Sequence, residues 1–205
     1  MVALFQSGDL IRQRVFRVIL DAVSRPGRIC QMPGATHRQD RFACLFMVLE
    51  TLLDQEATHC MIGEDGAAHL EPALYEATKS PPAALKEADF IIAPYGSTKG
   101  GVSRAKRGLP EYPDLSATVV YRVDYITRER DAPVKCSLRG PGILDSLALP
   151  TMEGFDHREL LQLCAVNRDF PLGVDALFVD PAGRIVALPR STQIQVKEPQ
   201  WHMSQ

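Results

Sequence analysis

Apolar residues recur at helical spacing in two segments of the first quarter of the chain. Between Asp9 and Pro26 they share one helical face: Ile11, Val15, Val18, Ile19, Ala22 and Val23. Pro26-Gly27 ends this predicted helix. A second helix is predicted from about Arg41 to Asp54, where the density of apolar side chains indicates burial on more than one side.

Over 119–126, valine and tyrosine occupy every second position and Arg122 and Asp124 lie between them, which predicts a half-buried strand. Residues 134–138 are expected to form its neighbour. Further strands are expected at 28–32, 57–62 and 90–93, and short helices at 71–79 and 82–88. From 94 to 113 periodicity is absent, and Gly, Pro and basic residues dominate, which predicts a long loop.

The last third of the chain predicts one helix and three strands. Asp156 and Glu159 precede an apolar helical face, as an N-terminal capping pair would. Strands are expected at 174–179 and 185–188, joined by the turn Pro181-Ala182-Gly183, and at 192–196.

Interspersed helices and strands favour an α/β fold with a mixed sheet covered by helices. The 205 residues suffice for one sizeable core. We therefore expect a single domain over 1–197 and a C-terminal tail over 198–205.

The net charge of −2 gives no global attraction for nucleic acid or acidic lipid. Arg outnumbers Lys by 17 to 6, which favours local ion pairs or phosphate contacts. The five cysteines show no CxxC spacing and indicate a reducing compartment, so we expect neither a disulfide framework nor a zinc site. No apolar stretch is long enough to span a membrane, and the expected location is the cytoplasm.

Two segments could bind an anion. The loop over 96–108 places Lys99, Arg104, Lys106 and Arg107 among glycines and hydroxyls, which suits either a phosphate site or a solvated basic loop. The segment Arg190-Ser191-Thr192 offers a guanidinium and two hydroxyls to an oxyanion, although Pro189 alone would explain a break between strands.

Two Pro-Gly turns, Ser24-Arg25-Pro26-Gly27 and Arg139-Gly140-Pro141-Gly142, are explained as a helix stop and a strand exit. Arg139 is a candidate for an ion pair or a partner contact. For covalent chemistry there is no nucleophile elbow and no Cys-His signature. Lys99 or Lys135 could form a Schiff base, but no local motif marks either.

Three stretches resemble the PhnH family of the bacterial carbon-phosphorus lyase system. They are FRVILDAVSRPGRI (16–29), LRGPGI (138–143) and above all DFPLGVDALFVDPAGRIVALPRSTQIQV (169–196). The resemblance covers most of the chain and is weakest between about Glu64 and Pro113.

The resemblance implies a three-layer αβα sandwich with a mixed sheet, similar to the large domain of pyridoxal-phosphate-dependent transferases, without implying that a cofactor is kept. It implies a homodimerising, non-catalytic subunit that assembles with PhnG, PhnI and PhnJ. With PhnG, PhnI and PhnL it would be required for transfer of ribose triphosphate from ATP to methylphosphonate. The alternatives are a pyridoxal-phosphate-fold enzyme and an independent phosphate- or nucleotide-binding module.

Overall fold

The computed structural model describes residues 2–35, 40–63, 69–128 and 136–196, with side chains from residue 8 onward. The helices are α1 (Val2–Ser24), α2 (Ala43–Leu52), α3 (Leu70–Thr78) and α4 (Arg158–Val166), with the 3-10 helices η3 (Gly101–Arg104) and η4 (Pro113–Leu115). The strands are β1 (Cys30–Gln31), β2 (His59–Met61), β3 (Phe90–Ala93), β4 (Thr118–Arg122), β5 (Tyr125–Thr127), β6 (Cys136–Arg139), β7 (Leu147–Ala148), β8 (Thr151–Glu153), β9 (Asp175–Val179), β10 (Arg184–Leu188) and β11 (Gln193–Val196).

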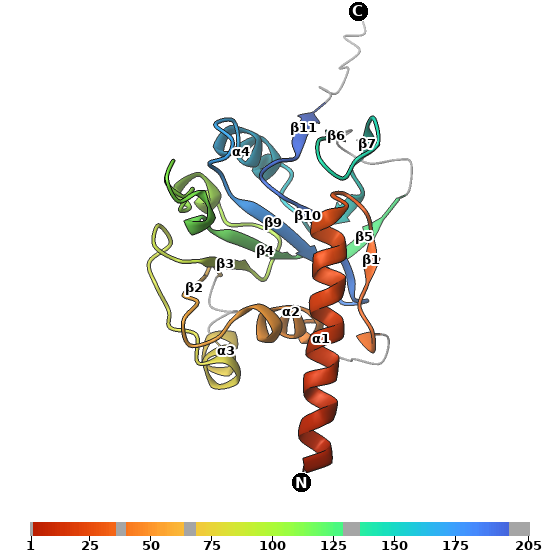
Figure 1. Ribbon diagram of the computed structural model, residues 1–205, viewed down its shortest axis with the longest axis vertical. Helices are drawn as coiled ribbons and strands as arrows, with labels where there is room; N and C mark the ends of the chain where they lie inside the picture. The colour runs from red at the N-terminus through yellow and green to blue at the C-terminus, as the bar shows by residue number, and fades with distance from the viewer. Residues whose placement is uncertain (1, 36–39, 64–68, 129–135, 197–205) are drawn as a thin grey trace, which may run out of the picture.

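A six-stranded sheet forms the centre of the molecule, in the order β1-β10-β9-β4-β3-β2 (Figure 1). The strands β2, β3, β4 and β9 are parallel neighbours, whereas β10 pairs antiparallel with both β9 and β1. Two small antiparallel sheets, β11-β6-β7 and β5-β8, lie beside it. The expected α/β class with a mixed sheet is confirmed.

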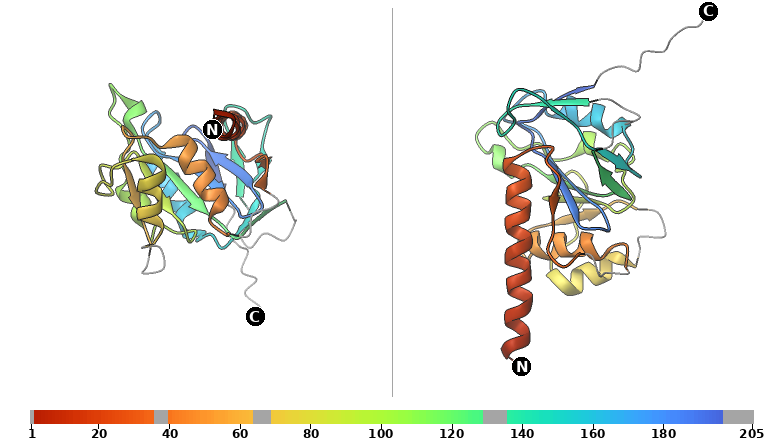
Figure 2. Two further views of the ribbon diagram at one scale, coloured as in Figure 1. Left: turned by 90° about the horizontal axis from the view of Figure 1, so that it is seen from below. Right: turned by 90° about the vertical axis from the view of Figure 1, so that its right-hand side faces the viewer.

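One face of the sheet packs against α1, α2 and α3. The helices contribute Val15 and Ile19, Leu45 and Leu49, and Leu74, and the strands contribute Ile92, Val120 and Leu177. Both predicted early helices are confirmed, and α1 begins further toward the N-terminus than the apolar pattern required. The N-terminal end of α1 extends past the rest of the molecule (Figures 1 and 2).

The other face packs against α4, η3 and the smaller sheets. Tyr121 of β4 and Phe178 of β9 stack there with ring centroids 5.1 Å apart, and Phe155 meets both rings edge-on. Helix α4 adds Leu160 and Leu163 to the same cluster. Helices therefore lie on both faces of the central sheet.

The strand predicted over 119–126 is two strands, and the half-buried assignment is wrong. Strand β4 is buried on both faces because it is a central strand of a parallel sheet. The chain then leaves this sheet near Asp124, and β5 pairs with β8 instead. The expected pairing with 134–138 is also wrong, because β6 pairs with β11 and β7.

Two other local predictions fail for identifiable reasons. Residues 82–88 form no helix, because Pro82 bridges to His59 and the Ala83 amide donates to the His59 carbonyl. The N-cap of α4 is His157 rather than Asp156, although the Arg158 amide does donate to the Asp156 carboxylate at 3.1 Å. The long loop at 94–113 contains η3 and the start of η4.

The predicted hairpin at the end of the chain is confirmed as β9 and β10, and β11 matches the last predicted strand. The buried carboxylate of Asp180 holds the turn by accepting hydrogen bonds from the Arg184 amide at 2.9 Å and the Arg184 Nε at 2.5 Å. It also accepts from the Ile126 amide at 3.0 Å, which fixes the start of β5. The tail predicted at 198–205 lies outside the described residues.

Candidate functional site

A buried carboxylate joins α4 to the loop after β3. Glu159 is 1% exposed and accepts hydrogen bonds from Ser97 Oγ at 2.8 Å, from Thr98 Oγ1 at 2.9 Å and from the Thr98 amide. Tyr121 donates its phenolic proton to Glu159 Oε2 at 2.5 Å. Burial and the negative charge of Glu159 raise the pKa of Tyr121 well above its usual value near 10, so the phenol remains a donor. Because the carboxylate is enclosed and engaged by four donors, its role is structural.

The basic loop over 96–108 does not gather its cations. It starts at the carboxyl end of β3 and returns to the amino end, where Lys106 Nζ lies 2.5 Å from Asp89 Oδ1. Arg107 contacts the Val166 carbonyl at 3.4 Å and lies 3.9 Å from Asp169. Lys99 and Arg104 are exposed at different points of this path. The geometry therefore favours the solvated-loop interpretation over a phosphate nest.

Arg190 is a structural anchor in this fold. Its guanidinium makes a bidentate pair with Asp175, with Nη2 to Oδ2 at 2.7 Å and Nε to Oδ1 at 3.3 Å, and it also donates to the Pro113 carbonyl. These contacts join β9 to η4 and use the donors that an oxyanion would need.

A groove of about 440 Å³ borders this segment. It is lined by Arg190, Ser191 and Thr192, together with Arg168 and the exposed ring of Phe170. The Thr192 hydroxyl is buried there without a hydrogen-bond partner. Arg139 is exposed on β6 at the position that pairs with Gln193. Lys99 and Arg104, the other two sequence candidates, do not line this groove.

The structure reveals a cationic and aromatic cluster that sequence reasoning missed. At the carboxyl end of β4, Arg122 is 8% exposed and pairs with Asp124 at 2.6 Å. Arg41 lies 4.6 Å from the ring centroid of Phe42 and 5.3 Å from that of Tyr95. In the sequence, Arg122 occupies a polar position of an alternating strand, so the pattern indicated solvent exposure.

Helix α1 presents apolar side chains on the surface as well as toward the core. While Val15, Ile19 and Ala22 are buried, five large apolar side chains remain 41–53% exposed: Leu10, Ile11, Phe16, Leu20 and Val23. A surface helix normally carries polar residues on its outer face. The spacing of Phe16, Leu20 and Val23 places them on one stripe, which we call the α1 stripe.

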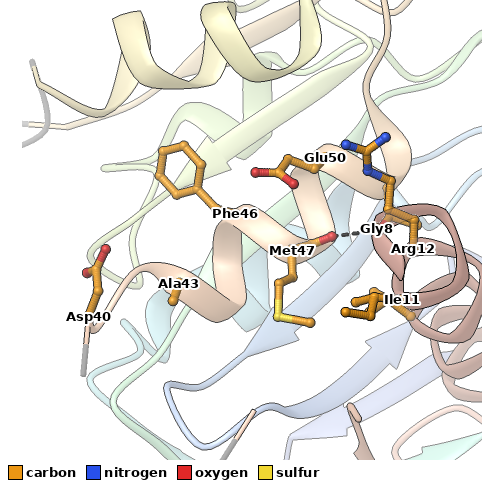
Figure 3. Close-up of a pocket in the computed structure, with 10 residues that line it drawn as sticks. Gly8, Ile11, Arg12, Asp40, Ala43, Phe46, Met47 and Glu50 are labelled. Atoms are coloured by element: carbon orange, nitrogen blue, oxygen red, sulfur yellow. Dashed lines mark hydrogen bonds between the residues drawn. The ribbon is translucent and has the colours of Figure 1, made fainter. Parts of the chain in front are cut away.

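A groove of about 340 Å³ separates the N-terminal half of α1 from α2. Figure 3 shows Ile11 and Arg12 of α1 across from Met47 and Glu50 of α2. Its floor is apolar, and Arg12, Asp40 and Glu50 give it a charged rim. This groove and the α1 stripe are two candidate interaction surfaces on the same helix.

Within the described ranges, no three His, Cys, Asp or Glu side chains lie close enough together to hold a metal ion. None of the five cysteines forms a disulfide in the described structure. Burial and the neighbouring Cys164 raise the pKa of Cys136 to about 11, so its thiol stays protonated and unreactive near neutral pH. Lys135 lies outside the described residues. In the part of the chain with described structure, no helix is both long and apolar enough to cross a membrane.

One protein family matches the chain over nearly its whole length. The profile of the family described as Bacterial phosphonate metabolism protein (PhnH) matches residues 4–195. No curated protein matches the sequence.

Proposed function

Since the chain belongs to the PhnH family of bacterial phosphonate metabolism proteins, we propose that it is a non-catalytic core subunit of the carbon-phosphorus lyase complex. In this role it assembles with PhnG, PhnI and PhnJ. With PhnG, PhnI and PhnL it supports transfer of ribose triphosphate from ATP to methylphosphonate. We also propose a cytoplasmic location, because the scattered cysteines form no disulfides.

The observation that carries the assembly role is the α1 stripe. Phe16, Leu20 and Val23 expose 44%, 51% and 41% of their surface on a helix whose neighbouring face, with Val15 and Ile19, is already buried in the core. Contiguous exposed apolar surface marks protein interaction sites on soluble proteins. Covering this stripe with a partner removes apolar area from water, which stabilises association.

We assign the α1 stripe to the homodimer contact. A two-fold pair of copies would bring the same stripe of each α1 together, so one surface serves both partners. Figure 2 shows that the N-terminal end of α1 extends past the rest of the molecule. The remaining surface is then available to the other subunits.

Changing Leu20 to Glu tests the dimer contact. The substitution places a charge in the centre of the proposed interface without touching the buried face, so the dimer should dissociate while the fold remains. Light scattering coupled to size-exclusion chromatography measures the mass. The matched control is Arg14→Glu, a charge change at another exposed position of α1. A Leu20→Glu protein that stays dimeric would exclude this surface.

Co-expression with PhnG, PhnI and PhnJ tests the assembly role itself. The expected result is one co-purifying particle that contains this chain. Methylphosphonate-dependent release of adenine from ATP should require this chain in addition to PhnG, PhnI and PhnL. A chain that never associates with these subunits would refute the proposal.

The likeness to the large domain of pyridoxal-phosphate-dependent transferases stays a prediction, and the mixed sheet with helices on both faces is compatible with it. An enzyme that keeps the cofactor would show a visible absorbance band, abolished by Lys99→Ala or Lys135→Ala. A protein that remains colourless after incubation with pyridoxal phosphate supports the non-catalytic role.

A further inference from the structure

Two Pro-Gly turns that are far apart in the sequence line one cavity. The turn after α1 contributes Arg25 and Pro26, and the turn after β6 contributes Gly142 with the residues that follow it. Arg128, which follows β5, completes the lining. The cavity has a volume of about 470 Å³, which is within the range of sites for small ligands.

Glycine makes the approach of these turns possible. A side chain at Gly142 would place its Cβ 2.2 Å from the Ser24 carbonyl oxygen, and the backbone there has φ +80°. Gly27 has φ +76° and donates its amide to the Ala187 carbonyl, which fixes the first turn on β10. The position of the cavity wall is therefore set by backbone contacts.

The cavity has an excess of positive charge. Arg25, Arg28 and Arg128 all line it, and its lining includes no Asp or Glu. Asp21 neutralises Arg25 through an ion pair one turn earlier on α1. Among the described residues, no carboxylate forms an ion pair with Arg28 or Arg128. Arg128 is oriented by donating from Nη2 to the Gly27 carbonyl at 3.0 Å, which leaves its other donors available.

The remaining walls are apolar. They consist of Pro26, Ile29, Ile143, Leu144 and Leu147, with Ser146 as a further polar group. Leu144 is 90% exposed at the rim. A fully hydrated inorganic ion would use only the arginines, whereas an anion with an apolar substituent would also cover this exposed surface.

We propose that this cavity, between the Arg25-Pro26-Gly27 turn and the Arg139-Gly140-Pro141-Gly142 turn, binds a small organic oxyanion with an apolar substituent. Guanidinium groups pair with such oxyanions through charge-assisted hydrogen bonds. Arg28 and Arg128 hold the oxyanion, and the leucine and isoleucine side chains contact the substituent. This inference rests on the cavity and does not depend on the assembly role.

Titration calorimetry of the full chain with phenylphosphonate and with inorganic phosphate tests the proposal. Phenylphosphonate should bind, should bind more tightly than phosphate, and should weaken as salt is added. Arg28→Ala and Arg128→Ala should each weaken binding about tenfold or more, because each removes a charged hydrogen-bond donor. Arg14→Ala, an exposed arginine elsewhere on α1, should change nothing.

Leu144→Ala separates the two parts of the site. It should reduce the preference for phenylphosphonate over phosphate and leave phosphate binding unchanged. Arg28 is exposed, so Arg28→Ala should fold normally even if Arg128→Ala does not, and circular dichroism verifies this. Absence of phenylphosphonate binding at millimolar concentration, or binding that Arg28→Ala leaves intact, would overturn the proposal.

Discussion

At the scale of single residues, enclosed charged groups hold the fold together more than the exposed basic residues of the loop over 96–108 do. Glu159 and Arg190 are both charged and both use their hydrogen-bonding groups to join distant segments. Their contacts cross about 40 to 80 residues of sequence, from Glu159 to Tyr121 and from Arg190 to Pro113. Neither role follows from the residue types or from their local spacing.

Replacing Glu159 with Gln should destabilise the protein by about 2 kcal/mol. The NH2 group of the glutamine would face hydroxyl groups that now donate hydrogen bonds to a carboxylate oxygen. Urea denaturation measures the change. Glu153→Gln, at an exposed position of β8, is the matched control and should have little effect. Equal stability of the two variants would mean that the buried carboxylate does not hold the loop.

At the scale of elements, side chains at the amino ends of the strands join neighbouring segments. Asp89, just before β3, accepts from Thr58 Oγ1 at 2.6 Å and from the Thr58 amide at 2.9 Å, and pairs with Lys106. Burial by itself would raise the pKa of Asp89, but the hydrogen bonds from Lys106 and Thr58 outweigh it and lower the pKa.

The lowered pKa gives a prediction about acid stability. Because the folded state binds the proton of Asp89 less readily than the unfolded state, the carboxylate stabilises the fold above the ordinary pKa of about 3.8. This contribution is lost as the pH falls through the folded pKa. Asp89→Asn should therefore lower the unfolding free energy at pH 7, and its difference from the wild type should shrink in acid.

The matched control for this titration is Asp9→Asn. Asp9 is an exposed carboxylate on α1, 3.7 Å from Arg12. Its replacement should have little effect on stability, as is usual for surface ion pairs. A difference between wild type and Asp89→Asn that stays constant from pH 7 to pH 2 would contradict the assigned role.

At the scale of the whole molecule, the close contact between the end of α1 and the turn after β6 links α1 to the small sheet β11-β6-β7. Gly142 makes this contact through the Ser24 carbonyl. Gly142→Ala should lower the stability of the fold more than Gly34→Ala does, although both positions have a positive φ, +80° and +71° respectively. Only at Gly142 would the new Cβ collide with backbone, whereas Gly34 has open space around it.

Thermal unfolding of both glycine variants measures this difference. Each should lose about 1 kcal/mol from the left-handed backbone, and Gly142→Ala should lose more because the turn must move away from α1. The same movement should weaken phenylphosphonate binding. Equal destabilisation by the two substitutions would show that the turn adapts freely.

Local sequence patterns were sufficient to predict the elements that form without a distant partner. Apolar spacing along the chain predicted α1 and α2, and the turn residues Pro181-Ala182-Gly183 predicted the hairpin. These signals act between residues that are close in the sequence, so the α/β class could also be predicted. The sequence predictions were wrong where a contact with a distant segment overrides the local pattern. Pro82 pairs with His59, and β4 is buried on both faces by segments that the pattern could not place beside it.

Tertiary contacts establish which charged residues act together. They place the Ser24–Gly27 and Arg139–Gly142 turns against each other, although the sequence explained the first as a helix stop and the second as a strand exit. They bind Arg190 to Asp175 and bury Arg122, while leaving Arg28 and Arg128 without carboxylate partners among the described residues. The physical reason is that electrostatic interactions depend on distance and burial, and neither is encoded in local spacing.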